Sequence, residues 1–236
     1  SIKKYMRKKF IENNLEEKFD TTTPYVYFPM SVDMERNLLI DSSMYTNQIE
    51  IIRIISKSLP VGYKLYVKEN PAQASREWRD NRAYEEIKNI PNVTMIKPNV
   101  NGRKLIQNSS LVISIAGTSS LEAAFYEKPS IIFGKVIYNM LPSVQKVESL
   151  EKLPELIRSS LKTKVDVSDL DKFLQLYEKN TFSFDMIEFL NRFNHEFYYD
   201  AGLFDVEINE KKLHDFLLKQ EDFFNELISA YVKKIK

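Results

Sequence analysis

The sequence predicts an α/β fold in which a parallel β-sheet is covered by helices on both faces and is followed by a helical C-terminal region. Short, nearly all-apolar runs alternate with stretches of helical periodicity up to about residue 150. Runs that are apolar throughout are typical of parallel strands buried on both faces, and their alternation with helices is typical of α/β proteins. Beyond residue 150 only helical patterns remain.

The predicted strands are rich in β-branched and aromatic residues and are bounded by prolines, glycines or polar turns. The strands are expected at 25–28, 63–67, 93–96, 111–115 and 130–133. The helices between them are expected at 49–59, over a polar stretch that contains Trp78, Tyr84 and Ile87, at 103–108 and at 121–126. This β-α order predicts a Rossmann-like, doubly wound parallel sheet.

The chain of 236 residues divides into three parts by its patterns. Residues 1–23 have a ragged helical spacing and are expected to be a helical linker from a preceding domain. Residues 24–163 form the predicted Rossmann-like domain, and residues 164–236 form the predicted helical annex. The last apolar stripe of the annex, from Leu213 to Tyr231, is expected to dock on the domain, with a partner or a membrane surface as the alternative.

Composition excludes several classes of function. The net charge is +1 and basic residues are matched by acidic ones, so nucleic acid is not an expected partner. The chain has no cysteine and only two histidines, His195 and His214, so we expect neither disulfides nor a metal site. No apolar run approaches the ~18 residues of a membrane span and no export signal is present, which predicts a cytoplasmic protein, membrane-associated only through an assembly complex.

The strongest candidate site is the turn that follows the fourth predicted strand. There an apolar strand runs into Gly117, then three hydroxyl residues, then a helix. Gly117 permits a positive φ and a close approach of a ligand to the backbone, and a serine can cap the helix, whose first-turn amides attract anions. Glu122, one turn in, can accept hydrogen bonds from a ribose diol. The predicted phosphate-binding residues of this turn are Ser114, Gly117, Thr118, Ser119, Ser120 and Glu122.

A structural interpretation of the same turn is equally simple, because any strand-to-helix turn favours glycine and a hydroxyl cap. The Gly-Lys-Ser/Thr ending of a Walker loop and the glycine fingerprint of dinucleotide-binding proteins are both absent. P-loop hydrolysis and hydride transfer are therefore disfavoured.

A second candidate site follows the second predicted strand. Lys68 can neutralise a phosphate, and Asn70, before Pro71, can donate a hydrogen bond to a phosphate or a sugar hydroxyl. Ligands of open α/β sheets bind beyond the carboxyl ends of the strands, the edge that carries both this loop and Gly117. A polar loop closed by a proline is the structural alternative. Residues that follow the first strand are weaker candidates for the rim of the site: Asp33, Glu35 and Arg36.

Three segments carry a resemblance to a known family. Tyr25-Val-Tyr-Phe-Pro-Met30, Leu65-Tyr-Val-Lys-Glu-Asn-Pro71 and Ser114-Ile-Ala-Gly-Thr-Ser-Ser-Leu-Glu-Ala-Ala-Phe-Tyr126 resemble, in order and spacing, the capsule polysaccharide biosynthesis family. That family is similar to GT-B glycosyltransferases and includes the Kdo transferases of capsule assembly. The resemblance covers about residues 24–160.

The resemblance implies one half of a GT-B fold, which binds the nucleotide of a nucleotide-sugar donor, CMP- or UDP-linked, for transfer to a saccharide or glycolipid acceptor. It implies no metal and no further cofactor. A His-Pro pair of the family falls on Asn70-Pro71, where asparagine lacks the charge and the proton transfer of histidine. The catalytic base commonly comes from the other half, so no residue is assigned that role.

Two further functions stay open. A nucleotide-sugar 2-epimerase uses a similar turn followed by a glutamate but needs acid–base residues that the sequence does not place. A non-catalytic nucleotide-binding domain of a polysaccharide assembly complex is favoured by Asn70 and by the room for only one Rossmann-like half.

Overall fold

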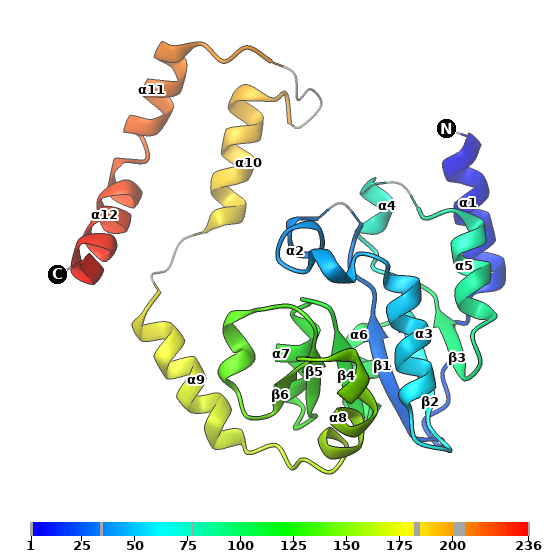
Figure 1. Cartoon of the computed structure of the whole chain (residues 1–236). Helices are drawn as coiled ribbons and strands as arrows, with labels where there is room; N and C mark the ends of the chain where they lie inside the picture. Colours follow the sequence, from blue (N-terminus) through cyan, green and yellow to red (C-terminus); the bar gives the residue numbers. More distant parts are fainter. Residues whose placement is uncertain (1, 34, 77, 182–184, 201–205, 236) are drawn as a thin grey trace. The chain divides into compact units, whose positions relative to one another are not determined.

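The structure is a computed structural model, and it describes residues 2–33, 35–76, 78–181, 185–200 and 206–235 (Figure 1). The chain divides into two compact units, Ser1–Leu174 and Gln175–Lys236. The first unit contains the whole of the sheet, and it carries the candidate site.

The sheet of the first unit has six parallel strands in the order β3-β2-β1-β4-β5-β6. This is the standard order of the doubly wound Rossmann fold, so the predicted fold class is confirmed. The strands are β1 (Tyr25–Pro29), β2 (Lys64–Lys68), β3 (Val93–Ile96), β4 (Leu111–Ser114), β5 (Ser130–Ile132) and β6 (Val144–Lys146).

Successive strand residues point to opposite faces of the sheet, and both faces are covered. In β1, Val26 and Phe28 belong to the larger apolar cluster, whereas Tyr25 and Tyr27 belong to a second cluster on the other face. All four side chains are at most 3% exposed, which explains why the run is apolar throughout.

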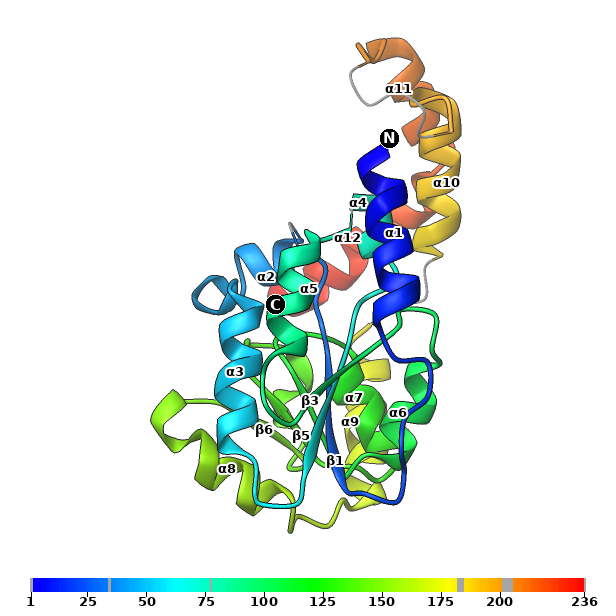
Figure 2. The same cartoon turned by 90° about the vertical axis from the view of Figure 1, so that its right-hand side faces the viewer.

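The helices form a layer on each face of the sheet, as Figure 2 shows. Beside Val26 and Phe28 pack α1 (Ile2–Asn14), α3 (Gln48–Ser58), α5 (Asn81–Lys88) and α8 (Leu153–Ser160). The opposite face is covered by α6 (Gly102–Asn108) and α7 (Ser119–Phe125). The short helices of the connections are α2 (Arg36–Leu39), η1 (Ser43–Tyr45), α4 (Gln73–Arg76), η2 (Ile137–Met140) and η3 (Leu150–Lys152).

Helix α3 illustrates how the sequence sets these elements. Its isoleucines recur at helical spacing, and Ile52 and Ile55 are fully buried against the sheet. Each contributes about 1.5–3 kcal/mol by leaving water. The side chain of Asn47 caps the helix by accepting a hydrogen bond from the amide of Glu50 at 3.2 Å.

The first unit extends beyond the predicted domain at both ends. Ile11 and Leu15 are 3% and 5% exposed within the larger cluster, and Glu16 forms a β-bridge with Ile96, so the end of α1 and the residues after it pack on the sheet. Helix α9 (Val167–Lys179) begins in the first unit, where Leu170 and Phe173 pack beside β5 and β6. The first compact unit thus ends at Leu174, within α9.

Two elements differ from the prediction in detail. The sixth strand, β6, reads Val-Gln-Lys and is only partly buried, so it lacks the apolar run that marks the other strands. Trp78 lies in the connection between α4 and α5 instead of within a helix.

The second unit is helical, as expected. It contains α10 (Met186–Phe197), α11 (Glu210–Leu218) and α12 (Glu221–Ile235). The sequence pattern predicts a helix over 182–197, whose first three residues lie outside the described residues. The last apolar stripe is split between α11 and α12, and its Phe216 and Phe223 pack on Phe189 of α10 with ring centroids 5.8 and 5.9 Å apart. Nowhere in the described ranges is a helix both long and apolar enough to cross a membrane.

Candidate functional site

The topological switch point of the sheet lies between β1 and β4. Strand β1 pairs with β2 on one side and with β4 on the other, and the chain winds in opposite directions from this point. Doubly wound sheets bind ligands at such switch points, beyond the carboxyl ends of the strands. At this edge β1 ends at Pro29, β2 at Lys68 and β4 at Ser114. These strand ends and the loops that follow them contain the predicted site residues.

Lys68 ends β2 on the side of the sheet that carries α6 and α7, because Tyr66, two residues earlier, belongs to that cluster. The residue is only 7% exposed. Within the described part of the chain, no carboxylate forms a salt bridge with its ammonium group. Burial lowers the pKa of Lys68, while the neighbouring Glu69 carboxylate opposes that shift.

The turn after β4 is fixed by its own serines. Ser114 and Ser120, at 1% and 0% exposure, share a hydrogen bond of 2.8 Å between their hydroxyl oxygens. The carbonyl oxygen of Gly117 accepts hydrogen bonds from Ser114 Oγ at 3.2 Å and from Tyr138 Oη at 2.7 Å. The hydroxyls of Ser114 and Ser120 are thus occupied in holding the turn.

The outer part of the turn is accessible. Thr118 is exposed, and Gly117 and Ser119 are half-buried. Thr118, and not a serine, is the N-cap residue of α7, and no side chain caps the helix. The φ of Gly117 is not positive, so the turn does not use the left-handed conformation that glycine permits; a Cβ atom at this position would lie 3.6 Å from Ser114 Cβ, an ordinary contact.

Glu122 lies on the first turn of α7 and accepts a hydrogen bond from Thr118 Oγ1 at 3.2 Å. Burial is the main reason why the pKa values of Tyr27 and Tyr138 are raised, and the Glu122 carboxylate raises both further. Tyr27 also lies under the start of α6, where a Cβ atom on Gly102 would be 3.5 Å from its hydroxyl. The Glu122 carboxylate therefore lies near both tyrosines.

Asn70 and Pro71 form the beginning of the loop after β2. The carboxylate of Glu69 accepts a hydrogen bond from the backbone amide of Asn70 at 2.8 Å, and Asn70 Oδ1 accepts one from the amide of Ala72 at 3.0 Å. Because Oδ1 is engaged with the backbone, the side-chain NH₂ group is the part of Asn70 that can meet a ligand. Pro71 is exposed.

A polar network that the sequence analysis did not predict joins the ends of β1 and β2. Arg79 donates to Glu69 Oε2 at 2.8 Å, to the carbonyl oxygen of Ser31 at 2.6 Å and to the Asp33 carboxylate. Glu69 is fully buried and also accepts a hydrogen bond of 2.9 Å from the Tyr84 hydroxyl. Buried charges need such partners. The signal available in the sequence was therefore Glu69, an acidic residue directly after a predicted buried strand.

The rim candidates have different positions. Asp33 belongs to this network and also accepts a hydrogen bond from the Gln48 side chain at 3.1 Å. Glu35 is half-buried and precedes α2, and Arg36 is exposed and pairs with Asp41 at 3.5 Å. Across the described ranges, no three His, Asp or Glu side chains are grouped so that they could hold a metal ion.

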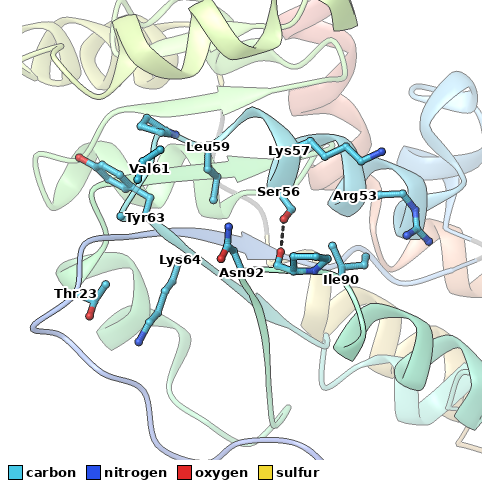
Figure 3. A pocket seen from close by; sticks show the side chains of 13 residues that line it. Thr23, Arg53, Ser56, Lys57, Leu59, Val61, Tyr63, Lys64, Ile90 and Asn92 are labelled. Carbon is cyan, nitrogen blue, oxygen red and sulfur yellow. Dashed lines mark hydrogen bonds between the residues drawn. The ribbon is translucent and has the colours of Figure 1, made fainter.

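A cavity of about 580 Å³ lies at the other edge of the sheet (Figure 3). It is lined by the end of α3, including Ser56 and Lys57, and by the turns that lead into β2 and β3. It is thus separated from Lys68 and Gly117 by the length of the strands.

Known structures are similar to part of the chain. UDP-GlcNAc 2-epimerase from Methanocaldococcus jannaschii has 14% identity and a TM-score of 0.48, over 74% of this chain and 49% of that chain. The β-Kdo 2,7 transferase of KpsC from Thermosulfurimonas dismutans has 12% identity and a TM-score of 0.44, over 65% and 51%. Its β-Kdo 2,4 transferase has 15% identity and a TM-score of 0.43, over 66% and 54%.

The chain thus spans about half the length of these structures. A comparison with curated protein sequences finds no significant match. The profile of one family, described as capsule polysaccharide biosynthesis protein, matches residues 1–151, which include the whole candidate site. The chain is therefore a member of the capsule polysaccharide biosynthesis protein family.

Proposed function

We propose that the chain is the donor-binding part of a glycosyltransferase of capsular or surface polysaccharide biosynthesis. The nucleotide of a CMP- or UDP-linked sugar binds at the carboxyl edge of the sheet, between Lys68 and the turn at Gly117. The observation that carries the proposal is Lys68 at the end of β2, which is only 7% exposed and whose ammonium group forms no salt bridge with a carboxylate within the described chain. A charge held in this way is stabilised when an anion arrives.

The strand register supports this placement. Lys68 pairs with Pro29, and the pairing of Tyr27 with Val112 brings Ser114 level with Pro29 on the next strand. Lys68 and Ser114 thus stand two strand spacings apart, or about 10 Å, on one face of the sheet. The gap between them suits phosphate groups.

Each residue of the turn has a role in the proposed site. The amides at the start of α7 and the hydroxyls of Thr118 and Ser119 donate to the phosphate, while Ser114 and Ser120 hold the turn in shape. Glu122 accepts hydrogen bonds from the ribose. Asn70 donates its NH₂ group to a phosphate or sugar hydroxyl.

In the reaction, negative charge develops on the nucleotide phosphate as the bond to the sugar breaks. Lys68 and the donors of the turn are fixed before this happens, so they stabilise the leaving group without rearranging. The acceptor is a saccharide or a glycolipid. We assign no catalytic base to this chain.

Calorimetric titration with CMP, UDP and GDP tests the proposal. We expect at least one of them to bind the wild-type chain, and to bind Gly117→Val at least tenfold more weakly because the branched side chain blocks the approach to the backbone. Gly117→Ala is the matched control, since its Cβ makes only an ordinary contact with Ser114. The proposal fails if no nucleotide binds wild type more tightly than Gly117→Val.

The same material separates the alternatives. Nucleotide binding without donor hydrolysis or transfer would favour a non-catalytic binding domain, to which Asn70 already points. Conversion of UDP-N-acetylglucosamine to its epimer without any acceptor would indicate a 2-epimerase.

A further inference from the structure

A second cavity, of about 340 Å³, lies at the same edge of the sheet as Lys68 but toward β3. One wall is α1, with Lys8 and Glu12, and the other walls are the loops after β2 and β3, with Pro71 and Pro98. Trp78 closes it from the side of the core, since the residue is 8% exposed within the larger apolar cluster.

Trp78 has an unused hydrogen-bond donor. Arg7 fixes its backbone by donating to the carbonyl oxygen at 2.6 Å. Its indole N–H has no acceptor in the described part of the chain, and it is not among the polar atoms that are sealed from solvent. Because Trp78 lines the cavity and its N–H is open to solvent, this donor is available to a ligand in the cavity.

The other walls define the chemistry of that ligand. Trp78, Pro71 and Pro98 offer flat apolar surfaces, while Glu12 and the exposed Asn99 offer groups that bind hydroxyls. A sugar ring has both features, with C–H faces that pack on flat side chains and hydroxyls at its edge. The volume lies at the lower end of the ~300–1,000 Å³ typical of small-molecule sites, which suits a sugar residue.

The position of the cavity connects it to the proposed donor site, on which this inference rests. Pro71 directly follows Asn70, and the ends of β3 and β4 are separated by three strand spacings, or about 14 Å. The cavity and the proposed donor site therefore lie along one edge of the sheet. We propose that the cavity binds a sugar ring of the saccharide substrate, from the acceptor or from the donor.

Trp78 is the one tryptophan of the 236-residue sequence, so its emission reports on this cavity alone. The probes are methyl β-glucoside, methyl β-glucuronide, UDP and UDP-glucose, added to the full chain. We expect a saturable emission change with a glycoside at about 10 mM, where a site of millimolar affinity is filled. A response to both glycosides indicates an acceptor sugar, whereas a response to UDP-glucose without a response to the glycosides or UDP indicates the sugar of the donor.

Two α1 variants give the matched control. Glu12→Phe, at a side chain that is 58% exposed, fills the mouth of the cavity and should weaken the response at least tenfold. Lys9→Phe adds the same ring at an exposed position that does not line the cavity, and it should leave the response unchanged.

The inference is overturned if no sugar-containing probe changes the emission, or if the response survives in Glu12→Phe. It is also overturned if UDP alone gives the response that Glu12→Phe removes, because the cavity would then bind a nucleotide. If UDP binds by calorimetry but no probe changes the emission of Trp78, the sugar site is rejected and the proposed function stands.

Discussion

Lys68 is a charged residue at a nearly buried position, where a neutral side chain should make the folded chain more stable. It is 7% exposed, and burial lowers its pKa because the charged form loses its hydration. Residues that break the rules of a stable core are expected at functional sites. The sequence predicted Lys68 as a site residue from its place after a strand, but its burial depends on residues distant in sequence and could not be predicted.

Replacing Lys68 by Met should therefore separate stability from binding. We expect Lys68→Met to raise the melting temperature of the free chain and to weaken nucleotide binding at least tenfold, since a hydrogen bond to a charged group contributes about 1.5–3 kcal/mol. Thermal unfolding and calorimetry check the two effects. Lys57→Met, at an exposed lysine beside the cavity of Figure 3, should change neither.

The lowered pKa of Lys68 also predicts a pH dependence. Between that pKa and the ordinary value of 10.5, the unfolded chain binds more protons at this position than the folded chain, so the contribution of Lys68 to stability rises with pH. Nucleotide affinity falls over the same window because the ammonium group is lost. The difference in melting temperature between wild type and Lys68→Met should thus shrink as the pH approaches 10.5, and a constant difference would contradict the assignment.

At the scale of elements, the strands with apolar runs were predictable and the contacts between elements were not. β1 to β5 lie where the sequence placed them, whereas β6 is short and half-exposed and has no pattern to read. The network of Arg79 joins residues up to 48 positions apart, so no local spacing reveals it. The turn at Gly117 was predictable from the sequence, whereas its backbone conformation, with a φ that is not positive, was not.

The Arg79 network should be the main support for the ends of β1 and β2. Arg79→Met leaves Glu69 fully buried without its counter-charge, which we expect to lower the free energy of unfolding by about 3–5 kcal/mol. Arg36→Met removes an exposed ion pair and should cost at most about 1 kcal/mol. Urea denaturation of both variants measures the contrast, and equal losses would show that the network does not have this role.

Two glycines of the same edge should respond differently to alanine. A Cβ atom on Gly134 would lie 3.1 Å from the carbonyl oxygen of Ile115 and closer still to Ser42 Oγ, so neighbours must move. We expect Gly134→Ala to destabilise the chain by about 1–3 kcal/mol and Gly117→Ala to stay within about 0.5 kcal/mol of wild type. The denaturation midpoints of the two variants test this difference, and equal losses of stability would contradict it.

At the scale of the whole molecule, the chain consists of two compact units, Ser1–Leu174 and Gln175–Lys236. The change to helical patterns marks the end of the sheet, but Leu170 and Phe173 of α9 still pack in the first unit. That packing depends on Tyr138 and on β6, which follow the predicted strands and carried no clear pattern.

A fragment of residues 1–179, which keeps α9 whole, should unfold cooperatively and bind the same nucleotides as the full chain. A fragment of residues 1–163 loses the contacts of Leu170 and Phe173, and we expect a clearly lower melting temperature. Calorimetric scans of the two fragments test whether residues 164–179 stabilise the first unit. Identical melting temperatures would show that the domain ends at residue 163.

The proposed function requires that an anion binds in the first unit, between Lys68 and the turn at Gly117. A crystal structure of the chain with the tightest-binding nucleotide measures this directly. We predict that phosphate oxygens lie within hydrogen-bonding distance of Lys68 Nζ and of the backbone between Gly117 and Ser119. A nucleotide bound at the opposite edge of the sheet, or a phosphate that leaves Lys68 without a contact, would contradict the account.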